Sequence, residues 1–149
     1  MKAARMAGAT GTTSINTSGA SGDIDLSNNA QVLNTLVVNA GTGDVYVNET
    51  DALTLEVTAA GDVTVDSVGA LTLNAGSMAD LTVTAASSVT DAGALTSTGT
   101  VSIDTSAANG NIDLDNNVHT LANFGGNAGT GTIDILELND LNLGTTTAS

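Results

Sequence analysis

The sequence contains no cysteine, no proline and no tryptophan, and its 149 residues include one tyrosine and one phenylalanine. The lack of cysteine excludes a disulfide framework and a thiolate metal site. The scarcity of aromatic rings removes the side chains that usually supply much of a globular core's buried area. Valine, leucine, isoleucine and alanine must therefore fill the interior, which favours a narrow one.

Positive charge is almost absent as well. Lys2 and Arg5 are the only cations, against 16 aspartates and glutamates, and the formal net charge is −14. Nucleic acids and anionic lipids are bound through basic surfaces, so we expect neither as a partner. No apolar run is long enough to span a bilayer, so we also expect no membrane insertion. The acidic, cysteine-free composition fits an extracellular or cell-surface protein.

The chain repeats itself at an offset of 88 residues. Residues 11–55 align with residues 99–143 without a gap, and 22 of the 45 aligned positions are identical. Gly22–Asn29 matches Gly110–Asn117, and Asn39–Gly43 matches Asn127–Gly131. Self-similarity at a fixed period is typical of stacked repeat architectures, which are usually scaffolds.

Short triplets with two aliphatic residues around one mostly polar residue recur along the whole chain. Period-two alternation places both aliphatics on one side of a strand and the middle residue on the other. The triplets therefore predict strands at residues 24–26, 45–47, 53–55, 63–65, 71–73, 81–83, 101–103, 112–114, 133–135 and 141–143.

The middle residues of these triplets recur every 18 residues in two interleaved series, which are Tyr46, Thr64 and Thr82, and Thr54, Thr72 and Thr90. A coil with two main strands per turn and about 18 residues per turn in its central part gives this spacing, with each strand hydrogen-bonded in parallel to its equivalent one turn earlier. Glycine- and asparagine-rich stretches such as Gly41–Gly43 and Asn74–Gly76 are expected at the corners.

We therefore predict an all-β fold, a parallel β-solenoid over residues 11–143. Residues 1–10 form an N-terminal lead or cap segment and residues 144–149 form a C-terminal tail. Strands spaced by 8–12 residues also fit an antiparallel β-sandwich, which stays open as the alternative. The turns that follow Thr90 are not assigned, because the spacing becomes irregular there.

The cadence Gly61-Asp-Val-Thr-Val65, Gly69-Ala-Leu-Thr-Leu73 and Gly110-Asn-Ile-Asp-Leu114 resembles the β-helical shafts of the filamentous haemagglutinin family of large bacterial exoproteins. The resemblance covers about residues 11–143. It implies a secreted shaft segment with a role in adhesion and a ligand on a host or matrix surface. The proline-containing secretion domain of that family is absent here.

Catalytic residues are not expected. His119 is the only histidine and aligns with Gln31, which indicates a polar surface position rather than a catalytic base. A carbohydrate-active β-helical enzyme would need basic or aromatic side chains to hold its substrate, and an ice-binding protein would need threonine columns without the interruptions at Tyr46, Asp113 and Asp134. We expect no enzyme activity, and these two functions are kept as alternatives.

Three aspartates, Asp44, Asp62 and Asp80, each precede a triplet and recur every 18 residues. A solenoid stacks them as a column with a spacing of about 4.8 Å. Such a column either repels itself mildly in water or binds Ca²⁺ between neighbouring carboxylates. No other cofactor is expected. A calcium-linked surface-layer or matrix-binding module is therefore the alternative function.

The triplets continue almost to both ends of the sequence, although terminal turns of solenoids normally need a cap. Either the chain is a piece of a longer shaft, or copies stack end to end into a homo-oligomer or filament. The expected end-to-end interface consists of Ile15, Ile24, Leu26, Ile133, Ile135, Leu141 and Leu143. Both readings predict a structural protein.

Overall fold

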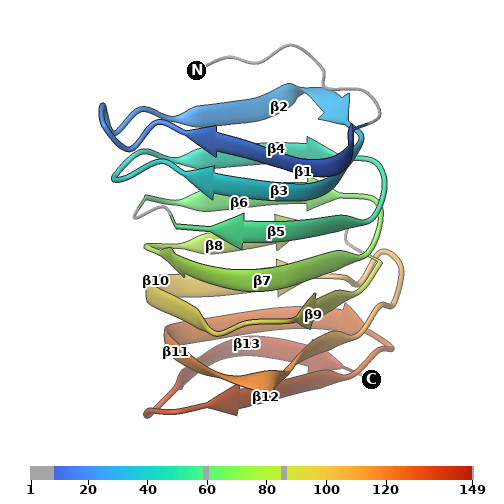
Figure 1. Ribbon diagram of the computed structural model, residues 1–149. Helices are drawn as coiled ribbons and strands as arrows, with labels where there is room; N and C mark the ends of the chain where they lie inside the picture. The colour runs from blue at the N-terminus through green and yellow to red at the C-terminus, as the bar shows by residue number, and fades with distance from the viewer. Residues whose placement is uncertain (1–8, 59–60, 85–86, 149) are drawn as a thin grey trace.

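The computed structural model describes residues 9–58, 61–84 and 87–148, and it shows 13 strands and no helix in these residues. The chain winds into a solenoid of about seven turns with about 19 residues per turn (Figure 1). The strands are β1 (Ala9–Asn16), β2 (Ile24–Gln31), β3 (Leu33–Asn39), β4 (Val45–Glu49), β5 (Leu53–Val57), β6 (Val63–Ser67), β7 (Leu71–Met78), β8 (Leu81–Thr84), β9 (Val89–Asp91), β10 (Leu95–Asp104), β11 (Ile112–Gly129), β12 (Ile133–Glu137) and β13 (Asn142–Ala148).

Two columns of stacked strands form the walls of the solenoid. The first column contains β1, β3, β5, β7, β9, the beginning of β11, and β12. The second contains β2, β4, β6, β8, the end of β10, the end of β11, and β13. Every pairing is parallel, which confirms the predicted β-solenoid and excludes the antiparallel sandwich.

The predicted period of 18 residues is confirmed in the central turns. Val45 pairs with Val63, and Val63 pairs with Leu81. The later turns are longer, because β10 first pairs with β7 at Leu95–Ser97 and then bends to pair with β8 at Val101–Asp104. This bend explains why the spacing gives no simple register after Thr90.

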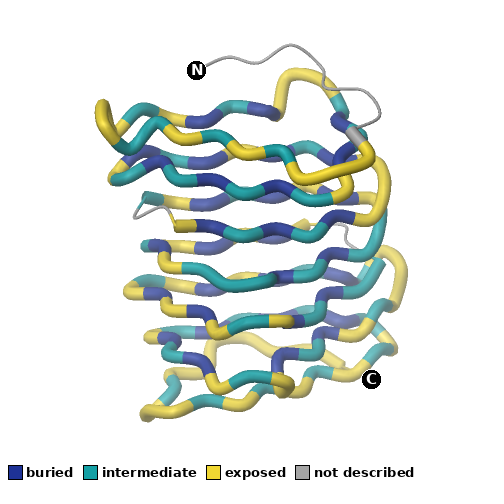
Figure 2. Tube along the Cα trace, viewed as in Figure 1, coloured by how far each residue is buried: buried dark blue, intermediate teal, exposed yellow. Residues whose placement is uncertain are grey.

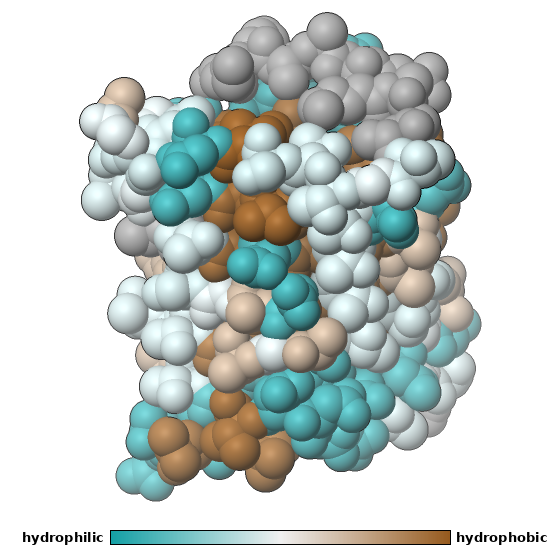
Figure 3. Space-filling view, in the orientation of Figure 1, coloured by the Kyte–Doolittle hydropathy of each residue, from teal (hydrophilic) through white to brown (hydrophobic). Residues whose placement is uncertain are grey.

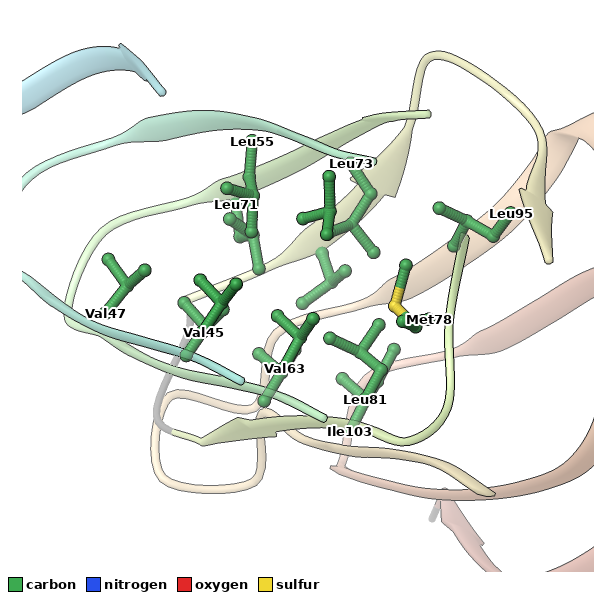
Figure 4. Close-up of a cluster of buried hydrophobic side chains, with 14 of the residues drawn as sticks. Val45, Val47, Leu55, Val63, Leu71, Leu73, Met78, Leu81, Leu95 and Ile103 are labelled. Atoms are coloured by element: carbon green, nitrogen blue, oxygen red, sulfur yellow. The ribbon is translucent and has the colours of Figure 1, made fainter. Parts of the chain in front are cut away.

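Aliphatic side chains from both columns meet in a narrow core, as Figure 4 shows for its central part. Residues along the central strands, such as β4, β5 and β6, alternate between buried and more exposed positions (Figure 2). Val45, Val63 and Leu81 stack on one another and are at most 1% exposed. Burying such a side chain contributes about 1.5–3 kcal/mol, and stacking of turns is what achieves the burial.

Strand pairing extends beyond the boundaries that the triplets predict. Ala9 and Thr10 already belong to β1, and residues 144–148 of the expected tail pair with β11 through Gly126–Thr146 and Asn127–Thr147. Backbone hydrogen bonds form these extensions without inward aliphatic residues, so the alternation does not signal them. The rest of the expected lead segment lies outside the described residues.

The corner predicted at Asn74–Gly76 is wrong, because these residues belong to β7. There the ladder contains an irregularity between Leu55 and Glu56, so that Glu56 pairs with Ala75. The turn at Gly41–Gly43 is confirmed. Gly41 adopts a φ of 65° there, which favours glycine, and its counterpart Gly129 adopts 61°.

The two copies of the repeat have the same local pairing but lie on opposite walls. Ile24 pairs with Val45 in the second column, whereas the equivalent pair Ile112 and Ile133 lies in the first. Leu36–Leu55 in the first column likewise corresponds to Phe124–Leu143 in the second. The 88-residue period therefore equals a whole number of turns plus one half.

Candidate functional site

The C-terminal end of the solenoid carries apolar side chains that no described strand covers. Strands β12 and β13 pair with β11 on one side only. Figure 3 shows hydrophobic atoms gathered at this end, at the lower left. A hollow of about 470 Å³ opens there, lined by Ile133, Ile135, Leu141, Leu143, Thr146 and Ala148. Leu143 is 60% exposed, and the other three aliphatics are partly buried.

The first copy of the repeat shows what covers such an end within the chain. The four aliphatics of the end correspond to Val45, Val47, Leu53 and Leu55, which are at most 2% exposed. Strand β6 lies on the first two and β7 on the last two, in parallel register. The same arrangement in the second copy has no covering turn among the described residues, so its aliphatics are more exposed than their counterparts.

The outer surface of the last turn is also more apolar than its counterpart. Leu136 and Leu138 are 44% and 69% exposed, and they stand where the first copy has Asn48 and Thr50. Leu143 lies nearby in sequence on β13. The last turn therefore exposes three leucines, two of them at positions that are polar in the first copy.

The N-terminal end differs from the C-terminal end. Ile15 is partly buried against the core, whereas Ile24 and Leu26 are each only 1% exposed. Of the seven residues predicted for the end-to-end interface, the structure thus places four at the uncovered C-terminal end. The other three lie in β1 and β2, the first strands of the two columns, and expose little apolar surface.

The predicted stack of Asp44, Asp62 and Asp80 exists, and Asp23 extends it by one turn. The Oδ1 atom of each aspartate accepts a hydrogen bond from a backbone N–H of the next turn. Asp23 binds the N–H of Asp44 at 3.0 Å, Asp44 that of Asp62 at 2.9 Å, and Asp62 that of Asp80 at 3.3 Å. We call these four residues the acidic column.

The acidic column stabilises the corner of the solenoid through these side-chain to backbone bonds. The second copy forms the equivalent hydrogen bond with an amide side chain, because Asn111 Oδ1 accepts a hydrogen bond from Thr132 N at 3.1 Å. The described residues contain no group of three or more acidic, histidine or cysteine side chains arranged to hold a metal ion. The negative potential of the column is nevertheless felt nearby, because the charge of Asp44 and its hydrogen bond with the hydroxyl raise the pKa of Tyr46.

The prediction that His119 occupies the surface is wrong. His119 and its counterpart Gln31 are both fully buried. His119 Nδ1 accepts a hydrogen bond from Leu95 N at 3.0 Å, and Nε2 lies 3.5 Å from Asp91 Oδ2 without a hydrogen-bond partner. Both residues use an inward corner position, where polar side chains satisfy backbone groups that the strand ladders leave free.

Asp91 completes this buried polar pair. Burial raises its pKa, but hydrogen bonds from Asn117 and Asn116 and the proximity of His119 outweigh that effect, so the pKa is held below its usual range. Asn116 donates through its backbone N–H and its side chain, at 3.2 and 3.1 Å, and Asn117 donates at 2.9 Å. The pair joins the turn of β9 to the second copy of the repeat.

Two glutamates that the sequence reasoning missed organise the same corner. Glu49 is fully buried and accepts hydrogen bonds from the backbone N–H groups of Leu33, Thr50 and Asp51 at 3.0, 3.0 and 3.2 Å. Its counterpart Glu137 accepts from Leu121 N at 3.1 Å. Both copies of the repeat have glutamate at this position. In each copy it continues the inward alternation of the preceding aliphatics, and these two features of the sequence would have identified it.

Comparisons with known proteins match part of the chain to a family of repeats. Residues 60–128 match the model of a family described as repeats of unknown function (DUF5649). Neither the curated proteins nor the solved structures provide a match. The described part of the chain has no helix with the length and apolar character needed to cross a membrane. The chain is thus a repeat protein of β-helical architecture.

Proposed function

We propose that this chain is an extracellular structural module, either a segment of an adhesin-type shaft or a subunit that assembles end to end into a filament. The uncovered aliphatic end formed by β12 and β13 carries this proposal. Equivalent aliphatics inside the chain are buried by the next turn, so addition of further strands here continues the same packing. The partner in a filament is another copy of this chain.

The composition and the buried position of His119 support a structural role without catalysis. His119, the only histidine, is fully buried and its Nδ1 atom is occupied by a backbone N–H. The resemblance to filamentous haemagglutinin shafts supports a location outside the cell, and the acidic composition fits such a location. That resemblance also supports a host or matrix surface as a ligand of the complete shaft.

Negative-stain microscopy of the purified chain at neutral pH tests the filament. We expect long fibres of uniform width, and we expect Leu143→Asp to abolish them because it places a charge in the apolar end. Val68→Asp is the matched control, since Val68 is 65% exposed and lies at a corner in the middle of the solenoid. Short rods of a single length would refute the filament and favour the shaft segment.

A further inference from the structure

We propose that Asn16 is an acceptor for N-linked glycosylation, in which its side-chain amide receives a sugar from an activated glycosyl donor. The sequence contains two acceptor motifs of the form Asn-x-Ser/Thr, which are Asn16-Thr17-Ser18 and Asn48-Glu49-Thr50. The motif alone does not distinguish them, but the fold presents them differently. The inference goes beyond the proposed structural role and does not depend on assembly into filaments.

Asn16 is the last residue of β1, and it is exposed where the chain leaves the strand. The connection from β1 to β2 projects from the solenoid at the left of Figure 1. Asn16 Oδ1 accepts hydrogen bonds from the backbone N–H and the hydroxyl of Ser18, at 2.9 and 2.7 Å. These bonds fix the oxygen of the amide, whereas its Nδ2 atom has no hydrogen-bond partner among the described residues. The nitrogen that would receive the sugar is therefore not engaged elsewhere in the described fold.

The second motif is built into the strand ladder. Asn48 lies within β4 and pairs with Asp66 of β6. The next residue, Glu49, is fully buried, and the hydroxyl of Thr50 donates to the carbonyl oxygen of Gln31 at 2.9 Å. A transferase recognises the asparagine together with the two residues that follow it. Recognition of this motif would therefore require β4 to leave the sheet, which the folded solenoid prevents.

The second copy of the repeat contains the same corner between two covering turns. Asp104 takes the place of Asn16, and its Oδ1 atom accepts hydrogen bonds from the N–H and the hydroxyl of Ser106 at 2.9 and 2.6 Å. Asp104 pairs with Thr84 on one side and with Asn127 on the other, yet it remains partly exposed. A turn stacked before β1 would therefore leave Asn16 accessible. A carboxylate lacks the amide nitrogen, so only the first copy offers an acceptor at this corner.

The transfer needs a glycosyl donor in which the sugar is activated by a phosphate or diphosphate, carried by a nucleotide or a lipid. Nδ2 of Asn16 attacks the anomeric carbon, so that a C–N bond forms and the bond from that carbon to the phosphate oxygen breaks. The phosphate leaves with the electron pair, and a base of the transferase takes the proton that the amide loses. The product carries a bulky, hydrophilic group on the outer surface of the solenoid.

Treatment of the folded chain with a purified N-glycosyltransferase and UDP-glucose tests the site, with intact mass and peptide mapping as readouts. We expect one hexose on the original chain at Asn16, none on N16D, and two on D104N, which creates a second motif in the equivalent corner. N16D and D104N each exchange the residue of one copy for that of the other, so both corners are expected to keep their hydrogen bonds. N48D is the matched control and should retain the single hexose.

The outcomes separate this inference from the proposed function. A hexose on Asn48 in the folded chain overturns the inference, as does an unmodified Asn16 under conditions in which the transferase modifies a short acceptor peptide. A single hexose on D104N also overturns it, because the geometry of the corner then does not select the acceptor. None of these results affects the filament, which microscopy of the unmodified chain tests separately. Circular dichroism and thermal melting verify that each variant retains the solenoid.

Discussion

The large side chain of Phe124 compensates for the missing side chain of Gly126. A double-mutant cycle can test this compensation. The first copy of the repeat has Leu36 and Val38 at these inward positions. In the second copy the Phe124 ring fills the space beside Gly126, where an added Cβ would lie 2.9 Å from the ring atoms Cε1 and Cζ. We therefore expect each single exchange toward the first copy to destabilise the solenoid, and the double exchange to restore it.

The magnitudes follow from the packing. Phe124→Leu removes buried ring atoms and leaves a small cavity, so we expect a loss of about 1–2 kcal/mol in the free energy of unfolding. Gly126→Val forces atoms against the ring, which costs about 1–3 kcal/mol. Removal of glycine from a strand offsets about 0.5–1 kcal/mol of that cost. In the double variant the valine fills the space that the ring vacates, so we expect its stability to be close to that of the original chain.

Urea denaturation followed by far-ultraviolet circular dichroism measures the cycle. The four proteins must unfold with equal dependence on urea, because repeat proteins do not always unfold in one step. We expect a coupling energy of about 2 kcal/mol, within the range for residues in direct contact. Additive single effects would refute the idea that the ring of Phe124 occupies the place of the Val38 side chain.

Three further predictions concern the polar groups. Glu49→Ala should lower the free energy of unfolding by about 3–5 kcal/mol, because it leaves buried backbone N–H groups without an acceptor, whereas Glu137→Ala in the uncovered last turn should cost less in the same urea assay. Because the pKa of Asp91 is held below its usual range in the folded state, its stabilisation is complete above the unfolded pKa of about 4 and is lost as the pH falls through the folded pKa. Asp91→Asn should therefore reduce the decline of stability on acidification, and an unchanged decline would contradict this role. Millimolar Ca²⁺ should leave the melting temperature unchanged, since one oxygen of each column aspartate from Asp23 to Asp62 already accepts a backbone N–H; a clear increase would instead establish calcium binding by the acidic column.

The sequence predicts strands well where two aliphatics flank one polar residue. Strand β3 was not predicted, because Leu36-Val37-Val38 is a continuous apolar run without alternation. The second half of β11 was not predicted either, since several of its buried positions are occupied by Gly126, Ala128 and His119 rather than by larger aliphatics. A parallel ladder tolerates such residues because backbone hydrogen bonds, and not side chains alone, define it.

The candidate site was only partly predictable for a related reason. The spacing of 18 residues placed Asp44, Asp62 and Asp80 in one column, but it did not show that each carboxylate binds the backbone of the next turn. Charged residues are rarely buried without partners, and this general rule outweighed the inward alternation that Glu49 continues after Val45 and Val47. Only the three-dimensional corner shows that Leu33, Thr50 and Asp51 supply its hydrogen bonds.

The 88-residue repeat period includes a half turn of the solenoid. Two copies that differ by half a turn lie on opposite walls, as Ile24 and Ile112 do, so intermediate turns must separate them within one chain. Residues 56–98 supply those turns, and their strands β6 and β7 bury the end of the first copy.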